Sequence, residues 1–338
     1  MQHAPDPEPA PLPSQDTSPN PTETDEAGQA GQAGQAAQRT QWRRPAILFA
    51  CTALTTLVSG TIMENAGVPP LVLIVTLLSF PGLLLDGLPF SLSVLGILMA
   101  HEMGHYLYAR WYGVRTSLPH FIPSPFFFII PNPGTFGAVI VTKAPYPHRQ
   151  ALMDIGAAGP VAGFVVAVPI MAYSLLGARV DAMPTDGGLY LGEPLVFQFL
   201  AYLIHGPLPE NYTIYLDSVG LAAWFGCLVT MLNLLPVGQL DGGHILYAFT
   251  GGAVRGRRLQ RNLTLVSFLA LAVLGLYSPG WWVFGALLLL MGRFSGFRHP
   301  APIDDAAPLP RRSKWLGWLA ILVFIQTFMP VPISFTGP

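Results

Sequence analysis

Long apolar runs are the feature that most constrains what this chain can fold into. Several runs approach the roughly 20 residues that a helix needs to cross a bilayer. The candidate spans are residues 46–63, 88–109, 152–176, 218–235, 262–277, 281–291 and 315–329. Charged residues make up only 10% of the chain, against about 25% in soluble globular proteins. We therefore expect an all-α polytopic membrane protein.

Charge and cysteine content exclude some other classes of protein. The net charge is −1, so the chain has no overall positive field to attract nucleic acid. Its two cysteines, Cys51 and Cys227, both lie in apolar segments. They are interpreted as small buried hydrophobic residues and not as a disulfide or a metal-binding pair.

The N-terminal region is polar and repetitive. Residues 1–41 are rich in Pro, Gln, Glu, Asp and Ala, and residues 28–36 repeat Gly-Gln-Ala. A segment with so little to bury is expected to be disordered. The first apolar run begins only near Ala46, which favours a signal anchor over a cleaved leader.

The positions of arginine and lysine predict an orientation. Arg39, Arg43 and Arg44 precede the first span, so the N-terminus is expected in the cytoplasm. Most later basic residues lie on the same side only if the apolar segment 71–85, which contains Pro81, does not cross. We therefore expect that segment to be re-entrant or interfacial, in a protein of the bacterial plasma (inner) membrane.

One short motif carries chemistry. His101-Glu102-Met103-Gly104-His105 has the pattern H-E-x-x-H, within the apolar run 88–109. Residues i and i+4 share a helix face, so His101 and His105 are spaced to bind one zinc ion, with Glu102 as general base. The alternative is a helix end with two unrelated histidines. Ionisable residues at membrane depth are costly, and this favours a functional site.

A third ligand is needed, because catalytic zinc takes three protein ligands and leaves one position open. Asp241 is the strongest candidate, since Pro236 and several glycines break the apolar segment just before it. The alternative for Asp241 is an N-cap of the following helix. His244 is an alternative third ligand, less favoured than Asp241.

The region between residues 113 and 150 is expected to be non-helical. It contains many prolines, and residues 134–141 have the pattern of a short strand after a turn. We expect a short membrane-associated β-hairpin or loop region beside the site. Its edge is suited to pairing with an extended substrate, and a plain structural loop is the alternative.

Two of these motifs together resemble the site-2 protease family of intramembrane zinc metalloproteases. They are residues 101–105 and the Asn233–Pro236 to Leu240–Gly243 block, which lie in the family's order on separate spans. A further span, opening near residues 158–160, lies between them.

The resemblance covers residues 88–251 and implies specific roles. It implies one Zn2+ per chain held by His101, His105 and Asp241, with Glu102 as the catalytic acid and base. It also implies that Asn233 lies near the metal, to orient substrate or polarise its carbonyl. The stretch Gly134-Thr135-Phe136-Gly137 resembles the subgroup related to chloroplast members, and we expect it to position substrate.

The expected organisation follows from the spans and the resemblance. It comprises a disordered tail (1–41), an N-terminal anchor with a re-entrant segment (42–87), a three-span catalytic core (88–251) and C-terminal transmembrane helices (252–338). The expected function is a zinc metalloendopeptidase that hydrolyses peptide bonds in or near transmembrane segments of membrane-protein substrates in the lipid bilayer. An inactive membrane scaffold and a metal-ion transporter are the alternatives.

Overall fold

The computed structural model describes residues 21–65, 67–126, 132–142, 145–183, 188–295 and 300–334. The chain divides into two units, residues 1–43 and residues 44–338. In the first unit, the described residues belong to helix α1 (Pro21–Glu64). Residues 21–41 thus differ from the disordered tail expected, because Ala, Gln and Glu favour helix even without an apolar face to bury.

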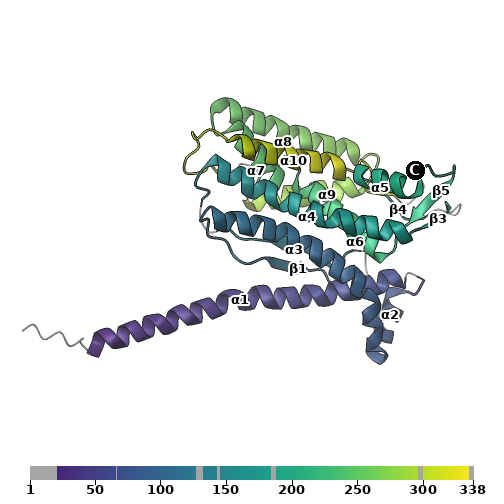
Figure 1. The fold of residues 1–338 in the computed structure, drawn as a ribbon, viewed down its shortest axis with the longest axis horizontal. Helices are drawn as coiled ribbons and strands as arrows, with labels where there is room; N and C mark the ends of the chain where they lie inside the picture. The colour runs from purple at the N-terminus through teal and green to yellow at the C-terminus, as the bar shows by residue number, and fades with distance from the viewer. Residues whose placement is uncertain are drawn as a thin grey trace, which may run out of the picture. The chain divides into compact units, whose positions relative to one another are not determined.

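The second unit is mainly helical, as expected (Figure 1). After the C-terminal part of α1, its helices are α2 (Pro70–Ser79), the 3-10 helix η1 (Pro81–Gly87), α3 (Leu88–Trp111), α4 (Arg149–Gly177), α5 (Leu195–His205), α6 (Ser218–Asn233), α7 (Asp241–Thr250), α8 (Val254–Leu274), α9 (Gly280–Ser295) and α10 (Arg311–Thr327). Among the described residues, three segments are long and apolar enough to cross a membrane: Trp42–Glu64, Pro81–Trp111 and Arg149–Gly177. The expected spans at α6 and α9 form shorter apolar helices.

The segment 71–85 is not one continuous helix. Helix α2 ends at Ser79, Phe80 leaves the helical region with φ −131° and ψ 71°, and η1 begins at Pro81. At 1.5 Å per residue, the 10 residues of α2 extend about 15 Å, half of the roughly 30 Å hydrocarbon layer. Helix α2 is therefore too short to cross a bilayer by itself.

A hairpin forms where the sequence predicts a strand. Strand β2 (Thr135–Val139) pairs antiparallel with β1 (His120–Pro123), and the register shifts between Phe121 and Pro123. Two further antiparallel pairs were not expected: β3 (Arg179–Ala182) with β5 (Tyr212–Tyr215), and β4 (Tyr190–Leu191) with β6 (Ile333–Ser334). Strands this short leave no periodic pattern by which a sequence predicts them.

Helix α4 is the centre of the second unit. It lies between α3 and α10, and it also packs against α6 and α7 (Figure 1). Its close approach to α3 depends on small residues, because a Cβ added at Gly104 would lie 2.5 Å from the Ala158 carbonyl oxygen. Small residues let the backbones of membrane helices approach closely.

We predict that Gly104→Ala destabilises the fold. The new methyl group has to push α3 away from α4, and overpacking of this kind costs about 1–3 kcal/mol. Gly96→Ala is the matched control on the same helix, since nothing lies within 4 Å of its added Cβ. That control is expected to gain up to about 1 kcal/mol from helix propensity. Unfolding of the metal-free protein in detergent measures both, and equal stabilities would contradict the prediction.

Candidate metal centre

Helix α3 brings the two histidines of the motif onto one buried face. His101 and His105 are 3% and 7% exposed. Their Nε2 atoms lie 3.1 Å apart, which is the result of the i, i+4 spacing. Two adjacent ring nitrogens therefore point to one spot inside the helix bundle.

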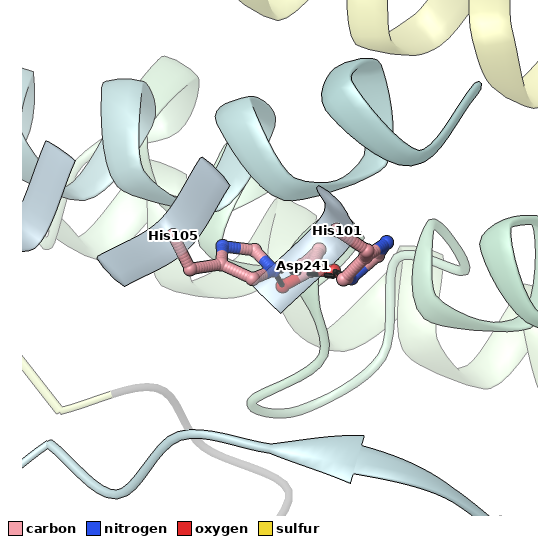
Figure 2. A group of neighbouring side chains, drawn as sticks. All are labelled: His101, His105 and Asp241. Atoms are coloured by element: carbon pink, nitrogen blue, oxygen red, sulfur yellow. Dashed lines mark hydrogen bonds and ion pairs between the residues drawn. The ribbon is translucent and has the colours of Figure 1, made fainter. Parts of the chain in front are cut away.

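Asp241 reaches the same spot from a different helix. Its carboxylate oxygens lie 3.3 Å from the Nε2 atoms of His101 and of His105 (Figure 2). The N-cap position of α7 belongs to Leu240, and no side chain caps this helix. Asp241 is therefore the first residue of α7, and its carboxylate faces the histidines and does not cap the helix.

A tight loop sets the position of Asp241. Helix α6 ends at Asn233 and α7 begins at Asp241. The two glycines that follow Asp241 pack on this loop: a Cβ at Gly242 would lie 2.1 Å from the Leu234 carbonyl oxygen, and one at Gly243 would lie 2.3 Å from that of Gly238. Only glycine fits there, so the Asp-Gly-Gly sequence folds α7 back onto the end of α6.

The hydrogen bonds fix which nitrogen of His105 is free to bind a cation. Its Nδ1 lies 2.7 Å from the carbonyl oxygen of Ile155 on α4. A carbonyl only accepts, so Nδ1 carries the proton in the neutral ring and Nε2 presents a lone pair. That lone pair faces the Asp241 carboxylate. Acceptors facing one another at this distance need a proton or a metal ion between them.

The donor set fits zinc. One ligand atom from each of His101, His105 and Asp241 lies within 4.8 Å of the others. Two imidazole nitrogens and one carboxylate oxygen are ligands that zinc accepts, and three protein ligands leave one position open. A histidine ligand that donates its second nitrogen to a backbone carbonyl is also the usual arrangement around zinc.

A glycine face of α4 gives the imidazoles their room. A Cβ at Gly159 would lie 2.1 Å from His105 Nε2, and one at Gly163 would lie 3.3 Å from His101 Nδ1. A Cβ at Gly156 would lie 2.8 Å from the Cβ of His244. Sequence reasoning missed these positions. The available signal was the spacing of small residues by three and four within an apolar span.

Glu102 is buried beside the ligands, and the hairpin reaches it. Its side chain is 5% exposed. The backbone N–H of Ile140, the residue after β2, donates to its carboxylate. The hairpin therefore lies against α3 at the motif, as expected for a region beside the site.

Two further polar residues were candidates near the metal. Asn233 Nδ2 lies 3.4 Å from His101 Nε2, so Asn233 is adjacent to the ligand group. His244 lies on α7 with its ring edge-on to that of Tyr146, at a centroid distance of 5.6 Å. His244 is not a member of the ligand group formed by the three residues above.

The expected substrate-positioning stretch divides into two parts. Gly134 has φ +74°, and its carbonyl accepts from Thr55 of α1 at 2.6 Å. Thr135 is buried, and its hydroxyl donates to the Ile122 carbonyl at 2.9 Å. These two residues hold the hairpin in shape. Phe136 is 65% exposed, and a Cβ at Gly137 would meet nothing within 4 Å, so a substrate role for these two stays a prediction.

Comparison with known proteins identifies the family. Residues 89–276 match the family model of Peptidase family M50. The chain belongs to this family, the site-2 protease family. The family resemblance expected from the two motifs is thus confirmed.

Several curated relatives are plant proteins named as probable chloroplastic zinc metalloproteases. EGY2 of Arabidopsis thaliana is 32% identical over 265 residues, which are 75% of this chain and 44% of the relative. EGY1 of Arabidopsis thaliana is 30% identical over 253 residues (72% and 43%). EGY3 of Oryza sativa subsp. indica is 27% identical over 273 residues (72% and 42%).

The matches bear on the length of the chain relative to its relatives and on its location. The chain spans less than half the length of the relatives. Their chloroplast location also does not fit the bacterial plasma membrane expected from the sequence. The three candidate spans among the described residues support a membrane protein.

We predict that Gly159→Ala weakens zinc binding while the protein stays folded. The added methyl overlaps Nε2 of His105, so the ring has to turn away. Disturbing the support of a metal ligand costs roughly 10- to 100-fold in affinity. Gly177→Ala on the same helix, with nothing near its added Cβ, is the control. Zinc titration against a competing chelator measures both variants, and equal affinities would refute the steric argument.

Proposed function

We propose that this chain is an intramembrane zinc endopeptidase of the site-2 protease type. It cleaves peptide bonds in or near transmembrane segments of membrane-protein substrates. One observation carries the proposal: two imidazole nitrogens from α3 and a carboxylate from α7 converge within the buried part of a membrane protein, beside a buried glutamate. The family membership supports it.

His101, His105 and Asp241 are the proposed holders of one zinc ion. A bound zinc ion supplies a Lewis acid for a water molecule and for the carbonyl of the scissile peptide. The chain contributes the orientation of the ligands. Ile155 fixes the His105 ring through its carbonyl, and the glycine face of α4 leaves room for both rings.

Glu102 is the proposed general base and acid. It takes a proton from the attacking water at its carboxylate and later gives that proton to the leaving amine. Its hydrogen bond from the N–H of Ile140 restrains the carboxylate beside the ligands. The contact also ties the end of β2 to the reacting group, so a strand added to the hairpin would lie close to the site.

The substrate has to present an extended backbone. A helical substrate hides its carbonyls in internal hydrogen bonds, so local unwinding precedes attack. The hairpin β1–β2 offers strand edges for a backbone that has unwound. Phe136, which is exposed on β2, is the proposed contact for a substrate side chain, with Gly137 giving the backbone close access.

Orientation stays a prediction from charge alone. Arg43 and Arg44 lie at the N-terminal end of the first candidate span, Trp42–Glu64. By the positive-inside rule, the N-terminus lies in the cytoplasm, and the motif lies near the cytoplasmic end of α3.

Glu102→Gln is the sharpest test. We expect cleavage of a model membrane substrate to fall by roughly 100- to 10,000-fold, because the amide cannot accept the proton. Zinc content should stay at that of the wild type, since Glu102 is not a ligand. An unchanged cleavage rate would reject the protease proposal. Zinc transport into vesicles by this variant at the wild-type rate would favour the transporter alternative.

Asn233→Ala tests the role of the amide. If Asn233 orients substrate or polarises its carbonyl, kcat is expected to fall by roughly 100-fold with zinc still bound. Asn262→Ala, on an exposed face of α8, is the control. Loss of zinc in parallel with activity would instead assign Asn233 to support of His101.

A further inference from the structure

A second polar site lies away from the metal ligands, where α3, α4 and α10 meet. It is a pocket of about 340 Å³, within the range of about 300–1,000 Å³ typical of small-molecule sites. Four aromatic side chains and two charged ones line it: Tyr108, Trp111, Tyr112, Trp315, Asp154 and Arg312. Neither the motif nor the ligand group uses any of these residues.

Two of the aromatic residues lie near the ends of their helices. Trp111 is the last residue of the candidate span Pro81–Trp111, and Trp315 lies in the second turn of α10. Both are strongly exposed, at 71% and 73%. Tryptophan and tyrosine gather at the headgroup level of a bilayer. A pocket beside the end of a candidate span is therefore placed where a bilayer has its headgroups.

Asp154 supplies a buried negative charge that is incompletely satisfied. It is 3% exposed, and one of its oxygens, Oδ2, accepts from the Tyr112 hydroxyl at 2.5 Å. The other, Oδ1, has no hydrogen-bond partner among the described residues. A buried carboxylate oxygen without a donor is costly. An ammonium in the pocket would give this carboxylate a positive partner.

Tyr112 interacts with both charged residues of the pocket. Burial, followed by the hydrogen bond and charge of Asp154, raises the pKa of Tyr112 to about 12. The phenol therefore stays protonated at any physiological pH and continues to donate to Asp154. Gln150 donates to the phenol oxygen at 3.0 Å, and Arg312 also interacts with it. Arg312 and Asp154 thus both interact with one phenol.

Arg312 leaves a positive charge at the rim. In the part of the chain that the structure describes, no carboxylate lies within 4.0 Å of its guanidinium. Guanidinium groups bind phosphate through paired N–H donors. The pocket therefore has a cation at its rim and an anion in its wall, with aromatic faces beside both.

We propose that this pocket binds the headgroup of an aminophospholipid. The phosphate pairs with Arg312, and the primary ammonium lies toward Asp154 and the aromatic rings, which attract cations. A choline headgroup fits less well, because its quaternary ammonium has no N–H to donate. A basic peptide segment fits less well too, because it would face the positive charge of Arg312.

Lipid binding to the purified full-length protein tests the proposal. The probes are phosphatidylethanolamine, phosphatidylcholine and phosphatidylglycerol with the same acyl chains, counted by native mass spectrometry. We expect phosphatidylethanolamine to bind roughly tenfold more tightly than phosphatidylcholine, the difference that one charge-assisted hydrogen bond makes. Equal binding of the three lipids would overturn the proposal.

Matched variants separate this pocket from general charge attraction. Arg312→Gln is expected to weaken binding of all three lipids, because each carries the phosphate, and Asp154→Asn is expected to remove the preference for phosphatidylethanolamine. Arg311→Gln, next to Arg312 on the exposed first turn of α10 and not part of the pocket, should keep it. If Arg311→Gln loses as much as Arg312→Gln, binding is diffuse and the proposal fails. Should Asp154→Asn not fold, Trp111→Leu replaces it, because Trp111 is exposed and lies outside the buried hydrogen bonds.

Competition identifies other occupants. Inorganic phosphate or a lysine-rich peptide is added to the complex with phosphatidylethanolamine. If the lipid stays bound in the presence of either competitor, the result supports the headgroup site. Displacement by phosphate alone would make the pocket a simple anion site, and displacement by the peptide would make it a peptide site; either result rejects the proposal.

Discussion

The convergence of Asp241 with two imidazoles inside an apolar bundle is the interaction on which the rest of the structure depends. Removing a carboxylate from water costs several kcal/mol unless it gains a charged or hydrogen-bonding partner. Here the partners come from α3, and the protonated Nδ1 of His105 is already committed to the Ile155 carbonyl. The free lone pairs and the carboxylate therefore have a common need for a positive charge. One metal ion supplies that charge to both imidazole nitrogens and to the Asp241 carboxylate.

Helix α4 makes that convergence possible without contributing a ligand. Its glycines allow α3 to approach closely at Gly104 and leave space for both imidazole rings. The same helix supplies the carbonyl that orients His105. Because the backbone does this, α4 needs small residues at the contact and contributes no side chain to the group of His101, His105 and Asp241. A large residue at Gly159 would exclude the ring it now supports.

The sequence predicts the site better than it predicts what surrounds it. The i, i+4 spacing puts His101 and His105 on one face of a helix, and the Pro and Gly residues before Asp241 indicate the break that the structure has. The helices α3, α4 and α6 agree with the expected spans to within a few residues. The carbonyl of Ile155 and the N–H of Ile140 had no signal in the sequence, because every residue carries the same backbone groups. Residues 21–41 form helix where composition indicated disorder, and the paired strands β3 and β5 are too short to leave a pattern.

Metal binding at such a site also contributes to the stability of the fold. The ligands come from α3 and α7, which are joined through α4, α6 and the loop at residues 234–240. An ion that binds only when these elements are packed stabilises the packed state by mass action, by about 2.7 kcal/mol at a free concentration 100 times its Kd. Without the ion, the facing lone pairs and carboxylate push α7 away from α3. The glycines that fold α7 back onto α6 oppose this, because the close backbone contacts at Gly242 and Gly243 hold Asp241 where it is. The loop thus preorganises the third ligand, and the ion completes a geometry that the backbone has already imposed.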